Sequence, residues 1–234
     1  MRAAVAAGAD RVELCANLLE GGTTPSLGLI RRARAVGGIV LHLMVRPRGG
    51  DFLYDDDEFA QMRDDIGAAK AERADGVVIG MLTADGQLDR ERMAELVAYA
   101  RPLAVTCHRA IDMAADPFAA LETLVELGVE RVLTSGQEAS ALDGLPLIAE
   151  LVRRAAGRIV VMPGAGISAR NIERIVRGSG ANEFHFAALH EIDGGMMFRR
   201  NHVFMGGELR APEFSRAVTS LDVLRRVLAK AQSA

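Results

Sequence analysis

The strongest constraint in this 234-residue sequence is a regular alternation of two kinds of segment. Short runs of aliphatic and β-branched residues are followed by longer segments in which apolar residues recur at helical spacing. Such alternation with short connections predicts a parallel sheet with right-handed crossovers. The predicted strands are Arg11–Cys15, Val40–Arg46, Gly76–Leu82, Leu103–His108, Arg131–Ser135, Arg158–Met162 and Glu183–Ala187, and the clearest helices are Phe59–Arg73, Asp89–Ala100, Pro117–Leu127 and Leu145–Ala156.

Two closures of this sheet fit the pattern, an open doubly wound sheet and a closed barrel. Seven evenly spaced strands without a dinucleotide-binding glycine fingerprint favour the barrel. We therefore predict an α/β fold, a TIM-type (β/α) barrel of parallel strands that occupies residues 1–234 as a single domain. A long loop is expected over 190–212 and a final amphipathic helix over 220–231.

The predicted barrel is one strand short, because barrels of this type have eight strands. Ala3–Ala7 followed by Gly8 has the character of the last turns of a helix. The strand expected before that helix, the first of the barrel, is missing. Two explanations stay open: the chain starts inside a longer reading frame, or the barrel is open at this point.

Composition narrows the classes of partner. The net charge of −3 provides no basic surface for nucleic acid or anionic lipid. No apolar run approaches the ~20 residues of a membrane span. Cys15 and Cys107 are too few for a disulfide framework and lack zinc-finger spacing. We expect a cytoplasmic protein with no nucleic-acid or membrane partner.

Polar residues gather where the predicted strands end, which is where such barrels hold their active sites. Side chains alternate between the two faces of a strand, so Leu41 and Leu43 should face the helices and Arg46 should point into the barrel. The residues predicted to meet at this mouth are Glu13, Arg46, Arg48, His108, Arg109, Asp112, Ser135 and His185.

A mixed cluster of buried charges is tolerated if its members are paired or are kept for a ligand. In the structural interpretation, Arg46 pairs only with Glu13, His108 bonds a neighbour, and Arg48 belongs to a turn ending at Asp51. In the ligand interpretation, the catalytic candidates are Glu13, His108 and Asp112, and a small anion is held by Arg46, Arg48, Arg109, Ser135 and His185.

Two further motifs have both a structural and a functional interpretation. Gly164-Ala165-Gly166 precedes a helix expected to begin at Ser168, and it either cradles a phosphate through backbone N–H groups or forms a tight turn. Met196, Met197 and Met205 either pack within the long loop or supply thioethers to copper.

Six blocks at the predicted strand ends, taken together, resemble the signature of the CutC copper-homeostasis family. They occur in family order from residue 10 to about residue 207. The resemblance implies a single β/α barrel, a cytoplasmic location, homodimers or larger assemblies, and a role in copper homeostasis with copper(I) bound by some members. The blocks are Asp10–Cys15, Glu20–Ser26, Arg46–Phe52, His108–Ala110, Leu133–Gln137 and Met162–Gly166.

The family's polar positions coincide with the eight residues already placed at the mouth. Two departures matter: the family begins with a strand that this chain lacks, and Cys107 stands where the family usually has an aromatic residue. Copper(I) prefers two or three soft ligands together. Alternation directs Cys15 inward with Glu13 and Cys107 outward with Val105, so the two thiols should not converge. A metal site with Cys15 and His108 or His185 is the remaining copper hypothesis.

Three functional hypotheses follow. The resemblance favours a copper-handling protein that binds copper(I) as its cofactor or cargo. The residues favour an enzyme acting on a small anionic or polyol substrate at the C-terminal mouth of the barrel, although no reaction follows from the sequence. In the third, the 190–212 loop docks a second copy of the chain. Whether the protein is an enzyme stays open at this point.

Overall fold

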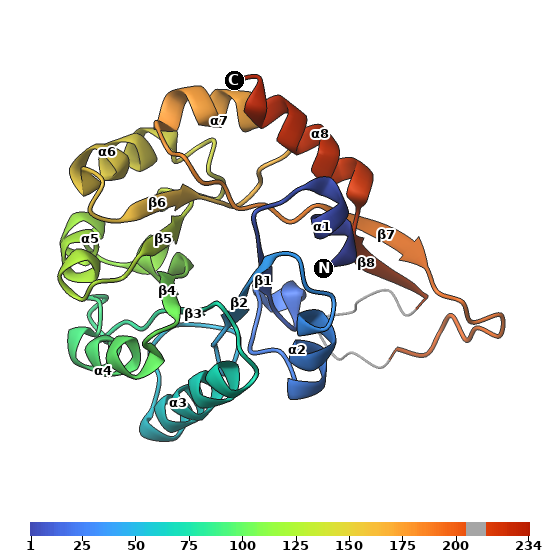
Figure 1. The fold of residues 1–234 in the computed structure, drawn as a ribbon, viewed down its shortest axis with the longest axis horizontal. Coiled ribbons are helices and arrows are strands. Elements are labelled where there is room, and N and C mark those ends of the chain that lie inside the picture. The colour runs from blue at the N-terminus through green and yellow to red at the C-terminus, as the bar shows by residue number, and fades with distance from the viewer. Residues whose placement is uncertain (205–213) are drawn as a thin grey trace.

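The computed structural model describes residues 1–204 and 214–234. Six parallel strands form one sheet in which sequence neighbours are also spatial neighbours. The sheet curls around a central axis with the helices on its outside (Figure 1), which confirms the predicted β/α-barrel architecture. The strands are β1 (Arg11–Leu14), β2 (Val40–Met44), β3 (Gly76–Ile79), β4 (Ala104–Cys107), β5 (Arg131–Thr134) and β6 (Val160–Pro163).

The connecting helices lie close to the predicted ranges. α3 begins three residues earlier than expected because Asp55 forms a capping box with Glu58. Asp89 caps the helix predicted to begin there, and Asp116 caps the helix predicted from Pro117. The helices are α1 (Arg2–Ala7), α2 (Leu27–Arg34), α3 (Asp56–Ala71), α4 (Arg90–Ala100), α5 (Pro117–Glu126), α6 (Leu145–Ala155) and α7 (Ile172–Ser179), with short 3₁₀ turns η1 (Leu18–Glu20) and η2 (Arg109–Met113).

The two faces of each strand separate as the alternation predicts. On β2, Leu41 and Leu43 are buried in the core that packs against the helices, whereas His42 and Met44 line the interior of the barrel. Parallel pairing sets His42 beside Glu13 on one side and Gly76 on the other. The inner wall therefore carries polar side chains among apolar ones, and at β2 both His42 and Met44 are buried.

The predicted seventh strand, Glu183–Ala187, is not a strand in the structure, so the sheet has six strands rather than seven. Its one backbone bond to β6 runs from His185 N–H to the Pro163 carbonyl at 2.9 Å. Phe186 and Ala188 instead pack beside Ala4 of α1 and the C-terminal helix. The segment thus lies between β6 and β1 without a hydrogen-bonded ladder.

The last part of the chain differs from the predicted loop. β7 (Leu189–Asp193) pairs antiparallel with β8 (Ser215–Thr219), so the expectation of a loop over 190–212 is wrong at its start. This pair projects from the barrel wall (Figure 1). Met205 and the remainder of the predicted loop to residue 212 lie outside the described residues. α8 (Leu221–Gln232) matches the predicted final helix and is capped by Ser220.

Among the helices of the described residues, none is both long and apolar enough to cross a membrane.

Candidate functional site

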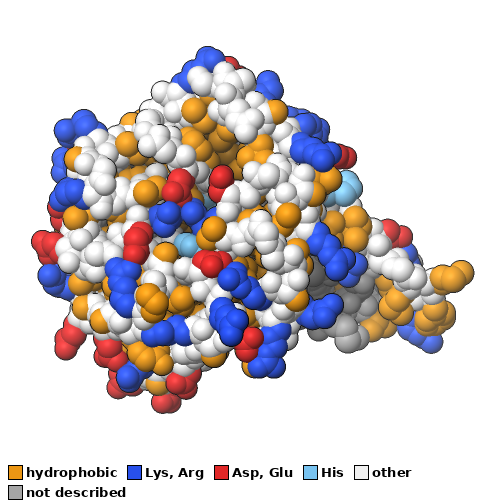
Figure 2. All heavy atoms as spheres, viewed as in Figure 1, with side chains coloured by type: hydrophobic (Ala, Val, Ile, Leu, Met, Phe, Trp, Pro, Cys, Tyr) orange, Lys and Arg blue, Asp and Glu red, His pale blue; other side chains and the backbone are white. Residues whose placement is uncertain are grey.

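A cavity of about 1220 Å³ occupies the barrel interior and reaches the ends of the strands. Figure 2 shows charged side chains of both signs around a hollow near the centre of the barrel, with an imidazole among them. Most of the residues predicted from the sequence line this cavity: Glu13, Arg46, His108, Arg109, Asp112 and His185, together with Cys15.

His108 is a polar side chain of the site that is only partly satisfied. It directly follows β4 and is 3% exposed. Its Nδ1 accepts a hydrogen bond from the Ala110 N–H at 3.2 Å, which leaves the proton of a neutral ring on Nε2. Nε2 is buried and has no hydrogen-bond partner among the described residues. The imidazole therefore presents an unused donor in the cavity wall.

The protonation state of His108 follows from its surroundings. Burial, and secondarily the positive charge of Arg46, lower its pKa from 6.5 to about 3. The ring of Phe52 lies against it, with ring centroids 4.9 Å apart. Gly80 makes room for it, since a Cβ at that position would lie 2.6 Å from His108 Cε1. The ring is held tightly and stays neutral at physiological pH.

Thr106 is a second buried residue with an unpartnered polar group, and the sequence analysis did not identify it. It lies two residues before His108 on β4, on the same inward face, and is 1% exposed. Its hydroxyl has no hydrogen-bond partner among the described residues. Period-two alternation from His108 could have identified it. The cavity wall thus carries two adjacent buried polar groups without partners.

Arg46 connects two loops at the mouth of the barrel, the loop that contains Glu20 and Gly22 and the loop that contains Gly50. Its Nη1 donates to the carbonyls of Glu20 and Gly22, at 2.7 and 2.9 Å, and its Nη2 to that of Gly50 at 2.9 Å. Its guanidinium also stacks over Phe52 at 5.2 Å. The ion pair with Glu13 considered above is not formed among the described residues. Arg46 is thus a buried cation that binds carbonyls through Nη1 and Nη2, while its Nε has no hydrogen-bond partner among the described residues.

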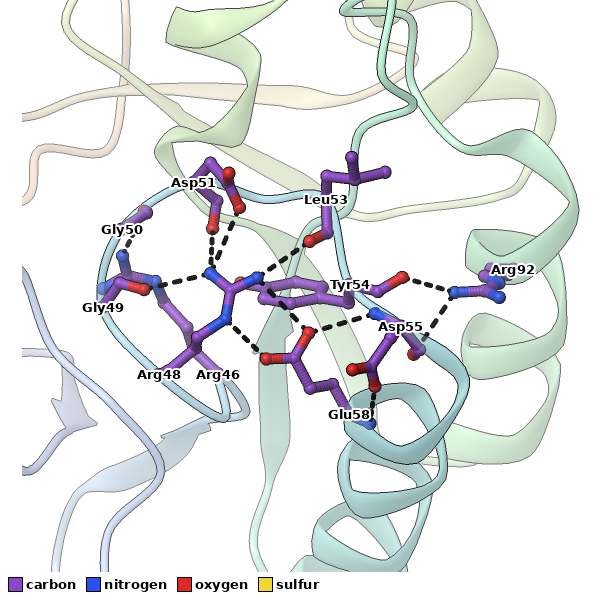
Figure 3. Close-up of polar contacts among 10 residues, drawn as sticks. All are labelled: Arg46, Arg48, Gly49, Gly50, Asp51, Leu53, Tyr54, Asp55, Glu58 and Arg92. Atoms are coloured by element: carbon purple, nitrogen blue, oxygen red, sulfur yellow. Dashed lines mark hydrogen bonds and ion pairs between the residues drawn. The ribbon is translucent and has the colours of Figure 1, made fainter.

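The structure does not bring Arg48 into the cavity. Figure 3 shows its guanidinium turned toward the start of α3, where Nε contacts Glu58 Oε1 at 2.5 Å. The other two nitrogens donate to the Gly49, Asp51 and Leu53 carbonyls and to both nearby carboxylates. All of its nitrogen atoms are used within the loop, so Arg48 fits the turn interpretation and not the predicted ligand-binding role.

Asp112 lies at the cavity edge, but its oxygens are fully occupied. They accept hydrogen bonds from Arg109 Nε, Thr134 Oγ1, the N–H and hydroxyl of Ser135, and the Gln137 N–H. With its oxygens already shared among these donors, Asp112 has no free lone pair left for a ligand proton. Asp112 and Ser135 therefore position Arg109, whose Nη2 donates to Ser135 Oγ at 2.7 Å.

Glu13 is the least constrained acid of the predicted set. Its carboxylate accepts one hydrogen bond, from the Cys15 thiol at 3.5 Å, and forms no ion pair within the described part of the chain. Both side chains line the cavity. His185 also lines it, from the segment beside β6. Of the predicted group, Glu13, His108, His185 and Arg109 thus line one cavity.

The floor of the cavity contains an ion cluster that the sequence reasoning also missed. Glu183 Oε2 accepts hydrogen bonds from Arg11 at 2.5 Å and Arg131 at 2.8 Å. Burial, reinforced by these two cations, lowers the pKa of neighbouring His42 to about 4. Arg11 lies two residues before Glu13, so alternation again carried the signal. The cluster closes the end of the barrel opposite the mouth.

The donor set is a poor fit for copper(I), which binds thiolates rather than thiols. Burial and the adjacent Glu13 carboxylate raise the pKa of the Cys15 thiol far above its usual range. Cys107 is fully buried on the outer face of β4, as alternation predicts, and burial raises its pKa to about 12. No group of three or more His, Cys, Asp or Glu side chains placed to hold a metal occurs in residues 1–204 and 214–234.

Comparison with known proteins gives one consistent result. Residues 1–190 match the family model named CutC family. The chain is 54% identical to the human copper homeostasis protein cutC homolog over 97% of this chain and 83% of that protein. It is 48% identical to a CutC family protein of Mesorhizobium japonicum, over 99% of this chain and 90% of that protein.

Solved structures agree with these matches. A crystal structure of CutC from Streptococcus agalactiae aligns with a TM-score of 0.73 at 36% identity, covering 76% of this chain and 88% of that one. Phosphoribosylanthranilate isomerase from Pyrococcus furiosus aligns with a TM-score of 0.56 at 12% identity, over 99% of this chain and 93% of that one. The second similarity shows the barrel fold alone.

Proposed function

This chain belongs to the CutC family, and we propose that it binds a small polar metabolite at the mouth of its barrel and performs acid–base chemistry on it. In this proposal, His108 donates a hydrogen bond to the ligand through Nε2, and Thr106 contributes its hydroxyl. Glu13 is the base. Arg109 contacts the ligand at the edge of the site.

The observation that carries the proposal is the pair of unpartnered polar groups on β4. Burying a hydroxyl or an imidazole N–H without a hydrogen bond costs about 1–3 kcal/mol for each group. Folded proteins usually avoid this cost. Here, Thr106 and His108 both bear it in the wall of one large cavity. A ligand that accepts these hydrogen bonds explains why the groups are there.

The chemistry follows from the charge states. A neutral imidazole that carries its proton on Nε2 can donate a hydrogen bond to a carbonyl or hydroxyl oxygen, and the low pKa of His108 keeps the ring neutral. Glu13 has one weak donor partner and can accept a proton from the ligand. Such a pair suits proton transfer at a carbon next to a carbonyl, with negative charge on oxygen stabilised by the His108 N–H.

Binding can be tested with a panel of small polyols, hydroxy acids, hydroxy ketones and their phosphate esters, using thermal shift followed by calorimetry. We expect at least one compound to bind the wild type and to lose about tenfold or more in affinity in Thr106→Val, the size expected for one lost hydrogen bond. The matched control is Thr123→Val, which changes a partly exposed α5 residue outside the cavity lining. If every panel member that binds does so equally well in Thr106→Val, the proposal fails.

Acid–base chemistry has its own readout. Exchange of a carbon-bound proton of the ligand with D2O, followed by proton NMR, requires no knowledge of the product. We expect exchange with the wild type and a loss of about 100-fold or more in Glu13→Gln. Exchange that persists in Glu13→Gln would remove Glu13 from the role of base while leaving the binding proposal intact.

Direct copper(I) binding is the second candidate, and the names of the relatives are what favour it. Its weakness is the protonated, half-buried Cys15 thiol and the remote Cys107. We derive no step through copper. A competition titration against a copper(I) chelator, in wild type and Cys15→Ser, tests this candidate directly. Stoichiometric binding that is lost in Cys15→Ser would favour it over our reading of the donor set.

We further propose a cytoplasmic location and self-association. The cytoplasmic location is supported by two free cysteines. Self-association is supported by the family resemblance and by the exposed side chains of Met196, Met197 and Phe198 near the β7–β8 pair. Sedimentation of the intact chain, compared with a Met197→Ser, Phe198→Ser double variant, tests the second point. Monomeric wild type would reject it.

A further inference from the structure

The turn between β6 and α7 leaves three consecutive backbone donors unused. The N–H groups of Ala165, Gly166 and Ile167 have no hydrogen-bond partner among the described residues, whereas Gly164 N–H before them is bonded to Thr134. The same three residues line the barrel cavity. A run of free amides in a cavity wall is a concave anion-binding arrangement.

The local structure explains why these amides are free. Ala165 and Gly166 both have positive φ, 79° and 68°, so the chain turns sharply here without forming a ladder or helix that would use their N–H groups. The carbonyls, in contrast, are bonded: that of Ala165 accepts from Ala141 N–H at 3.0 Å, and that of Gly166 accepts from Asn171 Nδ2 at 2.8 Å. The amides are thus held in place before any ligand arrives.

The donors do not belong to a helix terminus. α7 begins at Ile172, not at Ser168 as the sequence suggested, and Asn171 Oδ1 accepts from the Ser168 N–H at 2.7 Å. His185 lies beside the turn, its Cβ 3.4 Å from where a Cβ on Gly164 would be. An anion at this turn would be bound by loop amides, with an imidazole-bearing segment next to it.

An independent observation places a ligand in the same cavity. The His108 side chain is 3% exposed, and its Nε2 has no partner within the described residues. It stands on the inner wall at the end of β4, two strands along the sheet from β6. One molecule in this cavity can therefore accept hydrogen bonds from the imidazole at one end and from the turn at the other.

We infer that the turn 165–167 binds the phosphate group of the metabolite, so that the substrate class is a small phosphate monoester. The inference rests on the proposed function, because it assigns the anionic part of the ligand whose reacting part lies at His108. Three amides in a row match the several acceptor oxygens of a phosphate better than the two oxygens of a carboxylate.

The test uses inorganic phosphate on the intact chain with amide resonances assigned. Titration to about 50 mM covers the millimolar range expected for an isolated charged group. We expect phosphate to shift the amide signals of Ala165, Gly166 and Ile167. Ala165→Asp should weaken phosphate binding by about tenfold or more, because it adds a negative charge at the turn. Asp tolerates positive φ, so the turn itself is preserved.

Two further variants control for bulk and for strain. Ala165→Asn adds similar volume without charge and should lose clearly less affinity than Ala165→Asp. Ala156→Asp makes the same change at an exposed alanine that also has positive φ, 48°, at the end of α6 and outside the cavity lining. It should bind phosphate like the wild type.

The outcomes separate this inference from the proposed function. The inference is supported if phosphate shifts the amide signals of residues 165–167 and if its affinity falls in Ala165→Asp but not in Ala156→Asp. Absence of shifts at these amides, equal binding by Ala165→Asp, or acetate binding there as tightly as phosphate would overturn it. If an unphosphorylated panel compound still binds in a Thr106-dependent manner, the proposed function survives that result. If no compound binds, both fall.

Discussion

Thr106→Val is the sharpest test of the unpartnered groups, because it should stabilise the free protein. Thr106 is 1% exposed and its hydroxyl has no partner in the described part of the structure. Valine has nearly the same shape and replaces the hydroxyl with a methyl group. Removing a buried, unsatisfied hydroxyl should raise the free energy of unfolding by about 1–2 kcal/mol. For a chain of this size, that raises the Tm by about 2–4 °C per kcal/mol.

Thr134→Val is the matched control. Thr134 is equally buried, at 1% exposed, and lies on the next strand, β5. Its hydroxyl donates to Asp112 at 2.5 Å and accepts from the Gly136 N–H at 2.8 Å. The same substitution here leaves Asp112 and the Gly136 N–H without a hydrogen-bond partner, so it should lower the free energy of unfolding by about 2 kcal/mol or more. Urea unfolding of both variants without ligand gives the comparison. If Thr106→Val lost about 1 kcal/mol or more, the hydroxyl would be paired and the reasoning refuted.

Three other predictions concern the same wall. Burial lowers the pKa of His108 from 6.5 to about 3 in the folded chain, so between these pH values the unfolded chain binds one more proton than the folded chain. The contribution of His108 to the free energy of unfolding is therefore complete above pH 6.5 and falls toward pH 3, by up to about 1.4 kcal/mol per pH unit. In urea unfolding, His108→Phe should make this pH dependence weaker. Asp112→Asn sets an amide against five donors and should cost about 3–5 kcal/mol by the same assay, whereas a loss below about 1 kcal/mol contradicts the network. Gly80→Ala places a methyl group against the His108 ring, so it should lower the free energy of unfolding by about 1–3 kcal/mol and should also weaken ligand binding. Its control is Gly28→Ala in α2, where nothing lies within 4 Å of the new methyl group; this change should be neutral or slightly stabilising.

Period-two alternation predicted much of the fold and the inner wall because the apolar face of each strand is uniform. Leu41 and Leu43 fixed the direction of Arg46, and Val105 fixed that of Cys107, as the structure confirms. The method failed beyond the strand ends, where period two no longer applies. Arg48 follows β2 by four residues, and its orientation is set by Glu58, ten residues later on α3.

The strand count failed for a related reason. Residues 183–187 have the β-rich composition of a strand, with Phe184 and Phe186 on one side. A strand requires a continuous ladder, however, and within residues 1–204 and 214–234 the carbonyl of Pro163 supplies the only backbone bond from β6 to this segment. Composition reports which residues suit a pleated surface, not whether a neighbouring strand offers bonds. Thr106 shows the converse limit: alternation placed its strand correctly, but only coordinates reveal that its hydroxyl is unpaired.

Arg46 links the stability of the mouth to the state of His108. Its guanidinium has no carboxylate partner in the described residues, since its bonds go to the carbonyls of Glu20, Gly22 and Gly50. These carbonyls accept hydrogen bonds from Nη1 and Nη2 but leave the charge of the guanidinium in place. After burial, that charge is the second cause of the lowered pKa of His108. A Glu13–Arg46 ion pair would have removed this effect and also occupied the carboxylate. By binding loop carbonyls instead, Arg46 leaves Glu13 unpaired, while burial together with the Arg46 charge keeps His108 neutral. A carboxyl group without an ion pair and a neutral imidazole donor are the two groups that the proposed proton transfer uses.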